Sequence, residues 1–326
     1  LKNFETYVFY RESLDRFLRL FRVRPRLIAA DLHPDYLSTR YALQTGLPLI
    51  QVQHHHAHIA SCMAENSEQG PVIGVAFDGT GLGDDGTIWG GEFMVCDFTG
   101  YRRITHLPYI ALPGGDQVTH EPWRTALSMV LQVTEDEDFI FRLPFLNKIK
   151  PDTVHLVKTA VEKRINAPFS SGAGRWFDAV AALTGICTET GFHAEAPMRL
   201  EAAIERGKAF TYPFVYQEHR IDLKEAVQAM IYDSLVPGNA AHIATGFHNM
   251  LVSLIEKVVS EISEETGIRT VALSGGSFQN RYLSEQVENR LSQAGFKVLF
   301  HRNVPCNDGG LALGQIMIAA SQPGNQ

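Results

Sequence analysis

A short apolar segment that ends in a run of histidines sets the first constraint on the fold. Residues 48–52 read Pro-Leu-Ile-Gln-Val, Gln53-His54-His55-His56-Ala57-His58 follow directly, and the stretch 59–64 is again apolar. This order predicts a buried strand, a sharp turn and the start of a helix. On that helix His54 and His58 would lie one turn apart, about 5–6 Å between Cβ atoms, and could share one metal ion. The alternatives are an expression tag, which would be terminal, and two core histidines, which would need partners.

Helices and strands alternate through the first part of the chain. Apolar side chains at helical spacing over 7–22 precede a strand at 26–30, a helix at 35–43, the strand at 48–52 and the histidine helix. This alternation is typical of a parallel sheet with crossover helices. We therefore predict an α/β first lobe.

Size and charge restrict the function. With 326 residues, 45% of them hydrophobic and 20% charged, the chain can bury a large core, and two lobes are expected. The net charge of -7, from 29 basic and 36 acidic residues, argues against an extended nucleic-acid surface. A small ligand or a protein partner is the better interpretation. No apolar run of about 18 residues and no signal peptide occur, so no membrane association is predicted.

The four cysteines indicate a reducing compartment. Cys62, Cys96, Cys187 and Cys306 are far apart and form no Cys-x-x-Cys pair, so neither a zinc ribbon nor a disulfide framework is indicated. A cytoplasmic location fits this pattern. The chain opens with Leu1-Lys2-Asn3 and without methionine, which suggests a piece of a longer protein.

A glycine-rich segment follows the next apolar strand. Residues 72–77 run into Asp-Gly-Thr-Gly-Leu-Gly-Asp-Asp-Gly-Thr at 78–87. Such a loop exposes backbone N–H groups to a phosphate or a carbonyl, while Asp78 at the strand end can hold a metal-bound water or a hydroxyl. An ordinary hairpin to the strand at 89–95 is the alternative. The loop alone does not decide between them.

The region 112–208 is predicted to be a mainly helical insertion, with helices at 121–133, 151–165, 174–186 and 194–206. Arg124 and Arg175 are, in the commoner case, solvated surface charges. Asp178 differs because it lies on an otherwise apolar helix, where an unpaired carboxylate is costly to bury.

A second lobe is predicted after a linking strand at 210–216, with helices at 222–235 and 239–264. Its buried strand at 271–274 ends in Gly275-Gly276, which lets adenine or ribose approach the main chain, and Asn280 could bond a hydroxyl. The strand at 296–300 leads to Asp308, a candidate third metal ligand. Neither a P-loop nor a Rossmann fingerprint is present.

Seven motifs together resemble the carboxy-terminal part of the HypF family, the carbamoyltransferases of nickel–iron hydrogenase maturation. They are Gln53-His54-His55-His56-Ala57-His58, Phe77-Asp78-Gly79-Thr80-Gly81, Gly90-Gly91-Glu92, Glu121-Pro122-Trp123-Arg124, Gly174-Arg175-Trp176-Phe177-Asp178, Ser274-Gly275-Gly276-Ser277-Phe278-Gln279-Asn280 and Asn307-Asp308-Gly309-Gly310. That family is related to the tRNA threonylcarbamoyladenosine synthases and the antibiotic O-carbamoyltransferases. The resemblance implies a two-lobed actin and Hsp70-like ATPase fold of the ribonuclease H-like kind.

The resemblance also implies a site. His54, His58 and Asp308 would bind a divalent metal, zinc or iron, with magnesium as the further candidate. The nucleotide, ATP or AMP in the form of carbamoyl adenylate, would lie between the lobes. Residues assigned to it by the resemblance are Phe77, Asp78, Gly79, Thr80, Gly81, Asp178, Gly191 and Asn280, to which the close-approach argument adds Gly275 and Gly276. Backbone N–H groups at Gly79 to Gly81, next to Asp78, would stabilise charge that develops in the reaction.

The implied reaction passes a carbamoyl group to the carboxy-terminal cysteine thiol of HypE. No nucleophile is then needed from this chain, and Cys306 is expected to be structural. The family also carries acylphosphatase, zinc-finger and YrdC-like domains that are not found here, and the first β-hairpin of the first lobe is expected to be missing. Two alternatives stay open: a tRNA threonylcarbamoyl transferase, and a non-catalytic nucleotide-binding docking module.

The predicted division is a first lobe at 1–111, the helical insertion at 112–208 and a second lobe at 209–326.

Overall fold

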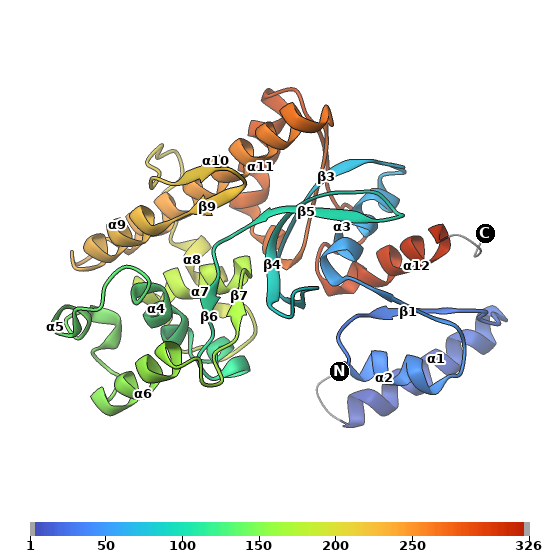
Figure 1. Cartoon of the computed structure of the whole chain (residues 1–326), viewed down its shortest axis with the longest axis horizontal. Helices are drawn as coiled ribbons and strands as arrows, with labels where there is room; N and C mark the ends of the chain where they lie inside the picture. The colour runs from blue at the N-terminus through green and yellow to red at the C-terminus, as the bar shows by residue number, and fades with distance from the viewer. Residues whose placement is uncertain (1–3, 323–326) are drawn as a thin grey trace.

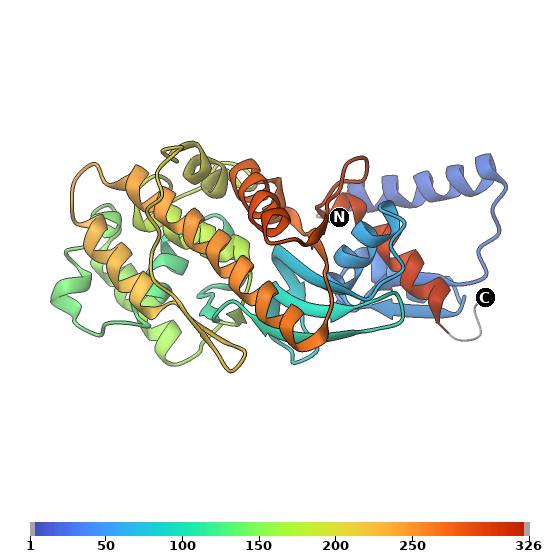
Figure 2. The same cartoon turned by 90° about the horizontal axis from the view of Figure 1, so that it is seen from above.

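The computed structural model describes residues 4–322, so Leu1-Lys2-Asn3 at the start lie outside the described part. Figure 1 shows a mixed α/β architecture, with α4 to α9 gathered at one end, α1 and α2 at the other, and the strands β3 to β5 between them. Seen from above, the long helix α10 runs along the helical end (Figure 2). No helix within residues 4–322 has the length and apolarity to cross a bilayer.

A small parallel sheet begins the fold. It consists of β1 (Ile28–Asp31) and β2 (Leu49–Val52), with Ile28 opposite Leu49, and it follows α1 (Phe4–Phe21) and encloses α2 (Leu37–Gln44) in sequence. This confirms the predicted alternation. The outer edge of β1 pairs with no strand in the described residues, and the expectation of an absent first hairpin stays a prediction.

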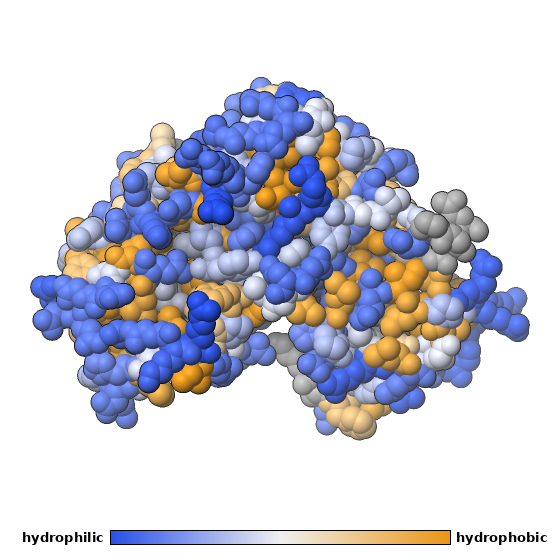
Figure 3. Space-filling view, viewed as in Figure 1, coloured by the Kyte–Doolittle hydropathy of each residue, from blue (hydrophilic) through white to orange (hydrophobic). Residues whose placement is uncertain are grey.

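Helix α1 buries none of its residues. Phe9, Phe17 and Leu20 expose 67%, 56% and 71% of their surface, and apolar residues are visible over this end of the molecule in Figure 3. An apolar face of this kind in solvent is unusual for a globular helix.

A larger mixed sheet forms the centre. In spatial order its strands are β11 (Lys297–Leu299), β10 (Thr270–Ser274), β3 (Val72–Leu82), β4 (Ile88–Cys96), β7 (Phe169–Ser170) and β6 (Ile110–Ala111), and β5 (Tyr101–His106) also pairs with β4. β10 is parallel to β3, whereas β4 is antiparallel to it. The sheet thus joins strands from the predicted first and second lobes. The predicted domain boundaries after residues 111 and 208 therefore do not coincide with the boundaries of the sheets. The division into three parts stays a prediction.

Strand β3 is buried on both faces, which explains its nearly continuous apolar sequence. Ile73, Val75 and Phe77 pack into the core on the helical side, while Val72 and Ala76 pack into a second core against α3 and α12. The alternation follows the two-residue period of a strand. Gly74 lies between them because an added Cβ would be 2.8 Å from Cγ1 of Ile59 on α3.

Of the two alternatives for 78–87, the structure shows the hairpin. β3 continues to Leu82 and turns back into β4 at Ile88. The pairing is irregular, however, because Phe77 is opposite Gly91 and Gly81 is opposite Trp89. Asp78, Gly79 and Thr80 therefore form a bulge opposite one residue of β4, and bulges of this kind redirect side chains next to functional sites.

The remaining helices are α3 (His54–Glu65), α4 (Pro122–Val130), α5 (Glu137–Ile140), α6 (Pro151–Glu162), α7 (Ala173–Leu183), α8 (Glu195–Ala202), α9 (Lys224–Ser234), α10 (Ala240–Thr266), α11 (Arg281–Gln293) and α12 (Leu311–Ser321). Of these, α4, α6, α7, α8, α9 and α10 overlap the predicted ones and differ at their ends by a few residues, whereas the short α5 was not predicted. The short 3-10 turns are η1 (Gly115–Thr119), η2 (Pro144–Leu146), η3 (Gly276–Gln279) and η4 (Asp308–Gly310). The linking strand predicted at 210–216 is reduced to β8 (Val215–Gln217), paired with β9 (Arg220–Asp222), because Pro213 cannot donate a ladder hydrogen bond.

Candidate metal and nucleotide site

Helix α3 places two histidines side by side, as the sequence predicts. Gln53 is its N-cap, and the Gln53 side chain accepts a hydrogen bond of 2.9 Å from the N–H of His56. The helix therefore begins at His54, so that His54 and His58 lie one turn apart with ring centroids separated by 4.9 Å. His55 and His56 point elsewhere: Nδ1 of His55 faces Gln53, and Nε2 of His56 is 2.6 Å from the carbonyl oxygen of Asp97.

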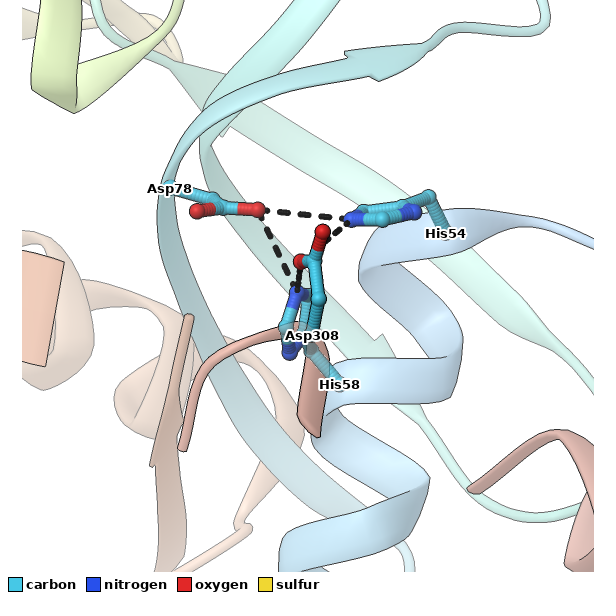
Figure 4. A group of neighbouring side chains, drawn as sticks. All are labelled: His54, His58, Asp78 and Asp308. Atoms are coloured by element: carbon cyan, nitrogen blue, oxygen red, sulfur yellow. Dashed lines mark hydrogen bonds and ion pairs between the residues drawn. The ribbon is translucent and has the colours of Figure 1, made fainter. Parts of the chain in front are cut away.

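Two aspartates meet these histidines. Asp78 comes from the β3 bulge and Asp308 from η4, and Figure 4 shows both carboxylates turned toward the imidazoles. One ligand atom from each of the four residues lies within 4.8 Å of all the others. We call His54, His58, Asp78 and Asp308 the His/Asp quartet. The quartet contains the three predicted ligands, and sequence reasoning missed Asp78 as the fourth.

A fifth residue, Asp31, orients His54. Its Oδ2 is 2.7 Å from His54 Nδ1, and its Oδ1 accepts the N–H of His33 at 2.8 Å. An ionised carboxylate only accepts, so Nδ1 of His54 carries a proton and Nε2 is the nitrogen directed into the quartet, where its lone pair would bind a metal. The sequence contained one signal for Asp31, namely its position at the end of a predicted parallel strand.

Electrostatics favour positive charge at the quartet. Burial alone would lower the pKa of His54, but hydrogen bonds with Asp308, Asp31 and Asp78 raise it well above its ordinary value. The pKa of His58 is raised as well, against burial, by Asp308 and Asp78. Burial would raise the pKa of Asp78, yet the two imidazoles hold it well below its usual range. A bound cation would replace those protons.

The donor set fits a divalent metal. Asp78 Oδ2 lies 3.3 Å and 3.2 Å from Nε2 of His54 and His58, and Asp308 Oδ1 lies 3.5 Å and 3.6 Å from the same two atoms. Ligands at about 2.0–2.1 Å from a tetrahedral ion are roughly 3.3 Å apart. Two imidazoles with two carboxylates suit zinc or iron better than magnesium, which prefers oxygen ligands alone.

Next to the bulge is a buried pair that lacks hydrogen bonds. Nη1 of Arg175 is 2.8 Å from Oδ2 of Asp178, but neither atom forms a hydrogen bond in the described part of the chain. Burial raises the pKa of Asp178 to about 6, and Arg175 opposes this rise. A Cβ added to Gly79 would lie 3.3 Å from Nη2 of Arg175, so the pair borders the bulge. Buried polar atoms without partners fit a polar ligand.

The first turn of α7 also faces the bulge. Added Cβ atoms on Gly172 and Gly174 would lie 2.5 Å from the oxygen and 3.0 Å from the Cα of Gly79. The positive end of the helix dipole therefore adjoins Gly79, an arrangement that favours an anionic group.

Glu92, on the strand opposite the bulge, was quoted in a motif but given no role. Its fully buried carboxylate accepts the N–H of Gly90 at 3.0 Å and the hydroxyl of Ser171 at 2.5 Å, and it pairs with Arg103 at 2.6 Å. It thereby fixes the loop before α7 against β4.

Gly275 and Gly276, which follow β10, have different surroundings. The N–H of Gly276 donates to Oδ1 of Asp78 at 3.2 Å, which connects it directly to the quartet. Gly275 has φ +104°, and its added Cβ would lie 2.2 Å from the oxygen of Phe77. Packing against β3 therefore requires a glycine there, whether or not a ligand approaches.

The other predicted nucleotide residues lie in different surroundings. Asn280 is the N-cap of α11, and its Nδ2 is 2.9 Å from Nε2 of the buried His248. Gly191 is exposed before α8, and its N–H donates to Glu195 at 2.6 Å. Thr80 is exposed at the bulge. Their contact with a nucleotide stays a prediction.

Comparison with known proteins gives the class and then the family. Residues 74–315 match the family described as carbamoyltransferase, Kae1-like domain, second subdomain, and residues 1–65 match the HypF Kae1-like domain. A protein named carbamoyltransferase HypF homolog from Cupriavidus necator is 38% identical over 96% of this chain and 82% of its own length. The chain therefore belongs to the HypF Kae1-like domain family.

Longer relatives and solved structures agree. Carbamoyltransferase HypF of Rhodobacter capsulatus is 39% identical over 93% of this chain and 40% of its own length. A crystal structure of full-length HypF in a phosphate- and nucleotide-bound form superposes with a TM-score of 0.93 at 40% identity, covering 99% of this chain and 51% of that one. HypF of T. kodakarensis gives a TM-score of 0.87 at 31% identity, over 97% and 43% of the two chains. The chain thus spans about half or less of these proteins.

Proposed function

We propose that this chain binds carbamoyl adenylate and transfers its carbamoyl group to a cysteine thiol at the carboxy terminus of HypE. The observation that carries the proposal is the His/Asp quartet beside the β3 bulge and the Arg175–Asp178 pair, in a chain of the HypF Kae1-like family. The nucleotide in the related full-length crystal structure supports an adenylate as the ligand.

The quartet would hold a divalent cation, zinc or iron. When bound, such an ion neutralises phosphate charge and polarises a carbonyl group. Asp31 fixes the imidazole of His54, and the N–H of Gly276 holds Asp78 in place. Backbone N–H groups of the bulge and the first turn of α7 are positioned to bind phosphate oxygens.

In the transfer, the acceptor sulfur forms a bond to the carbamoyl carbon while the bond from that carbon to the phosphate oxygen breaks. AMP leaves with the electron pair of that bond, and the thiol proton is released to solvent. The chain's own cysteines do not compete: Cys62, Cys96 and Cys187 are buried, and burial raises the pKa of the Cys306 thiol, which keeps it protonated. A cytoplasmic location, which free cysteines fit, is part of the proposal.

The test supplies the chain with freshly made carbamoyl adenylate and either a peptide ending in cysteine, with the HypE tail sequence, or a tRNA. We expect the peptide to gain the mass of one carbamoyl group and the tRNA to gain nothing. His58→Gln should abolish the gain, whereas Asp116→Asn, an exposed carboxylate on η1, should not.

Three outcomes would contradict the proposal. Modification of the tRNA when threonylcarbamoyl adenylate is supplied in place of carbamoyl adenylate would favour threonylcarbamoyl transfer, and nucleotide binding without any transfer would favour a docking module. Thiocarbamate formation from carbamoyl phosphate and ATP, with this chain as the only enzyme, would show that the chain also makes its adenylate. We expect that last reaction only when the YrdC-like, acylphosphatase and zinc-finger domains are added.

A further inference from the structure

A buried chain of three polar side chains lies behind the quartet. Oε2 of Glu65, in the last turn of α3, is 3.1 Å from Nδ1 of His301, and Nε2 of His301 is 2.8 Å from Oγ of Ser274. The side chains of His301 and Glu65 are only 4% and 9% exposed, and Ser274 is fully buried. We call Glu65, His301 and Ser274 the Glu–His–Ser relay.

The direction of the hydrogen bonds follows from the chemistry of each group. Glu65 Oε1 accepts the N–H groups of Arg302 and Asn303 at 2.9 Å and 2.5 Å, so its carboxylate acts as an acceptor throughout. Nδ1 of His301 must then carry the proton, and Nε2 must accept from the hydroxyl of Ser274. One tautomer of His301 satisfies all three side chains.

The acid, histidine and serine of the relay are connected in the same order as in a hydrolase triad, but the serine is not accessible to a substrate. A nucleophilic serine must reach its substrate, and Ser274 Oγ lies at the buried end of β10. The carbonyl oxygen of Cys306 lies 3.5 Å from this hydroxyl, whose one proton is given to His301, and it accepts the N–H of Gly275 at 2.9 Å instead. The backbone N–H that follows Ser274 is therefore bonded to the chain two residues before Asp308.

Other bonds from α3 reach the same segment. The hydroxyl of Ser61 donates to the carbonyl of Gly310 at 2.8 Å, and the side chain of Asn66 donates to the carbonyl of Phe300 at 3.0 Å. Hydrogen bonds from α3 and from the residue that follows it therefore hold both ends of the segment 300–310 against this helix. Asp308 needs such support because its side chain is 75% exposed and packing does not hold it.

We propose that the Glu–His–Ser relay is a positioning device that sets Asp308 against His54 and His58 before any cation binds. The same helix, α3, carries the two imidazoles at its start and the carboxylate of Glu65 at its end. The relay therefore fixes the distance between ligands from opposite ends of the chain. This inference rests on the metal site of the proposed function.

The experiment measures zinc affinity by calorimetry and the visible spectrum of the cobalt-loaded chain. His301→Leu removes both hydrogen bonds and should weaken zinc binding by about 10–100-fold, the usual effect of losing an outer-shell partner, with a changed cobalt spectrum. His301→Gln keeps one donor and one acceptor and should restore most of the affinity. Glu65→Gln has one acceptor oxygen where the carboxylate uses two, so it loses either the bond to Nδ1 or those to the backbone N–H groups and should fall between them.

Glu68→Gln is the matched control. Glu68 also joins the end of α3 to β11, through Lys297 at 2.7 Å, and its other hydrogen bonds are to Gln69 and Gly70 rather than to the segment 300–310. We expect parental zinc affinity for this variant. If His301→Leu does not fold, Ser274→Ala tests the other end of the relay with a smaller change.

Each result separates the inference from the proposed function. If the parent chain binds no zinc or cobalt, the metal site itself is wrong. If the parent binds but His301→Leu and Ser274→Ala have parental affinity and the parental cobalt spectrum, only the relay is wrong. Labelling of Ser274 by a fluorophosphonate would show a reactive nucleophile and would also overturn the positioning role.

Discussion

Individual side chains determine how the site is charged. Nδ1 of His54 is hydrogen-bonded to Asp31, and Nε2 faces Asp78 and Asp308, so the imidazole lies among three carboxylates. Asp178 is in the opposite situation, because it is buried with one arginine that does not hydrogen-bond to it. Two predictions follow from these environments.

Asp308→Ala should weaken zinc binding by at least about 100-fold, a larger effect than loss of an outer-shell partner, since it removes a direct ligand. The exposed position of Asp308 means that the thermal midpoint without metal should stay close to the parental value. Calorimetry with zinc and a melting curve measure the two quantities. Asp116→Ala serves as the control, and parental affinity in Asp308→Ala would remove Asp308 from the site.

Asp178 should make stability fall as pH rises. Its pKa is raised to about 6 in the folded chain, so the folded state holds a proton that the unfolded state has already lost above its ordinary pKa near 4. The contribution of Asp178 to the unfolding free energy of the parent should therefore decrease between about pH 4 and 6 and level off above.

Asp178→Asn lacks this titration. Its stability relative to the parent should rise by about 2–3 kcal/mol from pH 4 to pH 7, an order-of-magnitude figure from the pKa difference. Urea unfolding without nucleotide at several pH values gives the comparison, and Asp15→Asn on α1 controls for net charge. A pH-independent difference between parent and variant would show that Asp178 is not protonated as described.

At the scale of elements, the site depends on how closely β3, β10 and α12 approach their neighbours. Gly275 touches the backbone of β3, Gly276 touches Asp78, and Gly314 of α12 touches α3. A side chain at each of these positions would push a different pair of elements apart. The three substitutions should therefore have different effects.

Gly275→Ala and Gly276→Ala should separate stability from metal binding. The first puts a Cβ 2.2 Å from Phe77 oxygen at φ +104° and should cost roughly 3 kcal/mol of folding stability. The second puts a Cβ 2.9 Å from Oδ1 of Asp78 and should mainly lower zinc affinity. Urea unfolding and calorimetry on both variants distinguish the two effects. Equal losses of affinity and stability in both would contradict the assignment.

Gly314→Ala should loosen the contact between α12 and α3. The added Cβ would lie 1.8 Å from the carbonyl oxygen of Ala57 and 2.8 Å from the N–H nitrogen of Ser61, so the helices must move apart. We expect a loss of roughly 3 kcal/mol or more in the unfolding free energy. Gly100→Ala, where an added Cβ meets nothing within 4 Å, is the control. A parental melting temperature for Gly314→Ala would show that the helices are not in contact at this point.

For the whole molecule, the cation should act as a stabiliser. The quartet gathers ligands from α3, β3 and η4, and an unfolded chain cannot present them together. At a free zinc concentration about 100 times Kd, binding should add about 2.7 kcal/mol to the unfolding free energy. Thermal unfolding with zinc, and again after a chelator, measures this. An unchanged melting temperature in zinc would show that no folded metal site exists.

Local patterns in the sequence predicted the local structure well. The apolar periods placed α1, α2, β1, β2 and the start of α3, and the spacing of His54 and His58 predicted their common face. Long-range pairing was not predictable in this way. Gly276 and Asp78 are 198 residues apart, and no local period shows that β10 lies beside β3. For the same reason Asp78 was expected to hold a metal-bound water or a hydroxyl and was not identified as a ligand, and the bulge was not predicted.

The bond between Ser61 and Gly310 spans 249 residues and has a consequence during synthesis. A ribosome adds roughly 5–20 residues per second, so Asp308 follows the histidines of α3 by roughly 10–50 s. During that interval the nascent chain offers an incomplete ligand set to any passing ion. In the proposed metal site, the complete set of four ligands would therefore exist only after the last segment has emerged, and discrimination between ions would depend on that segment.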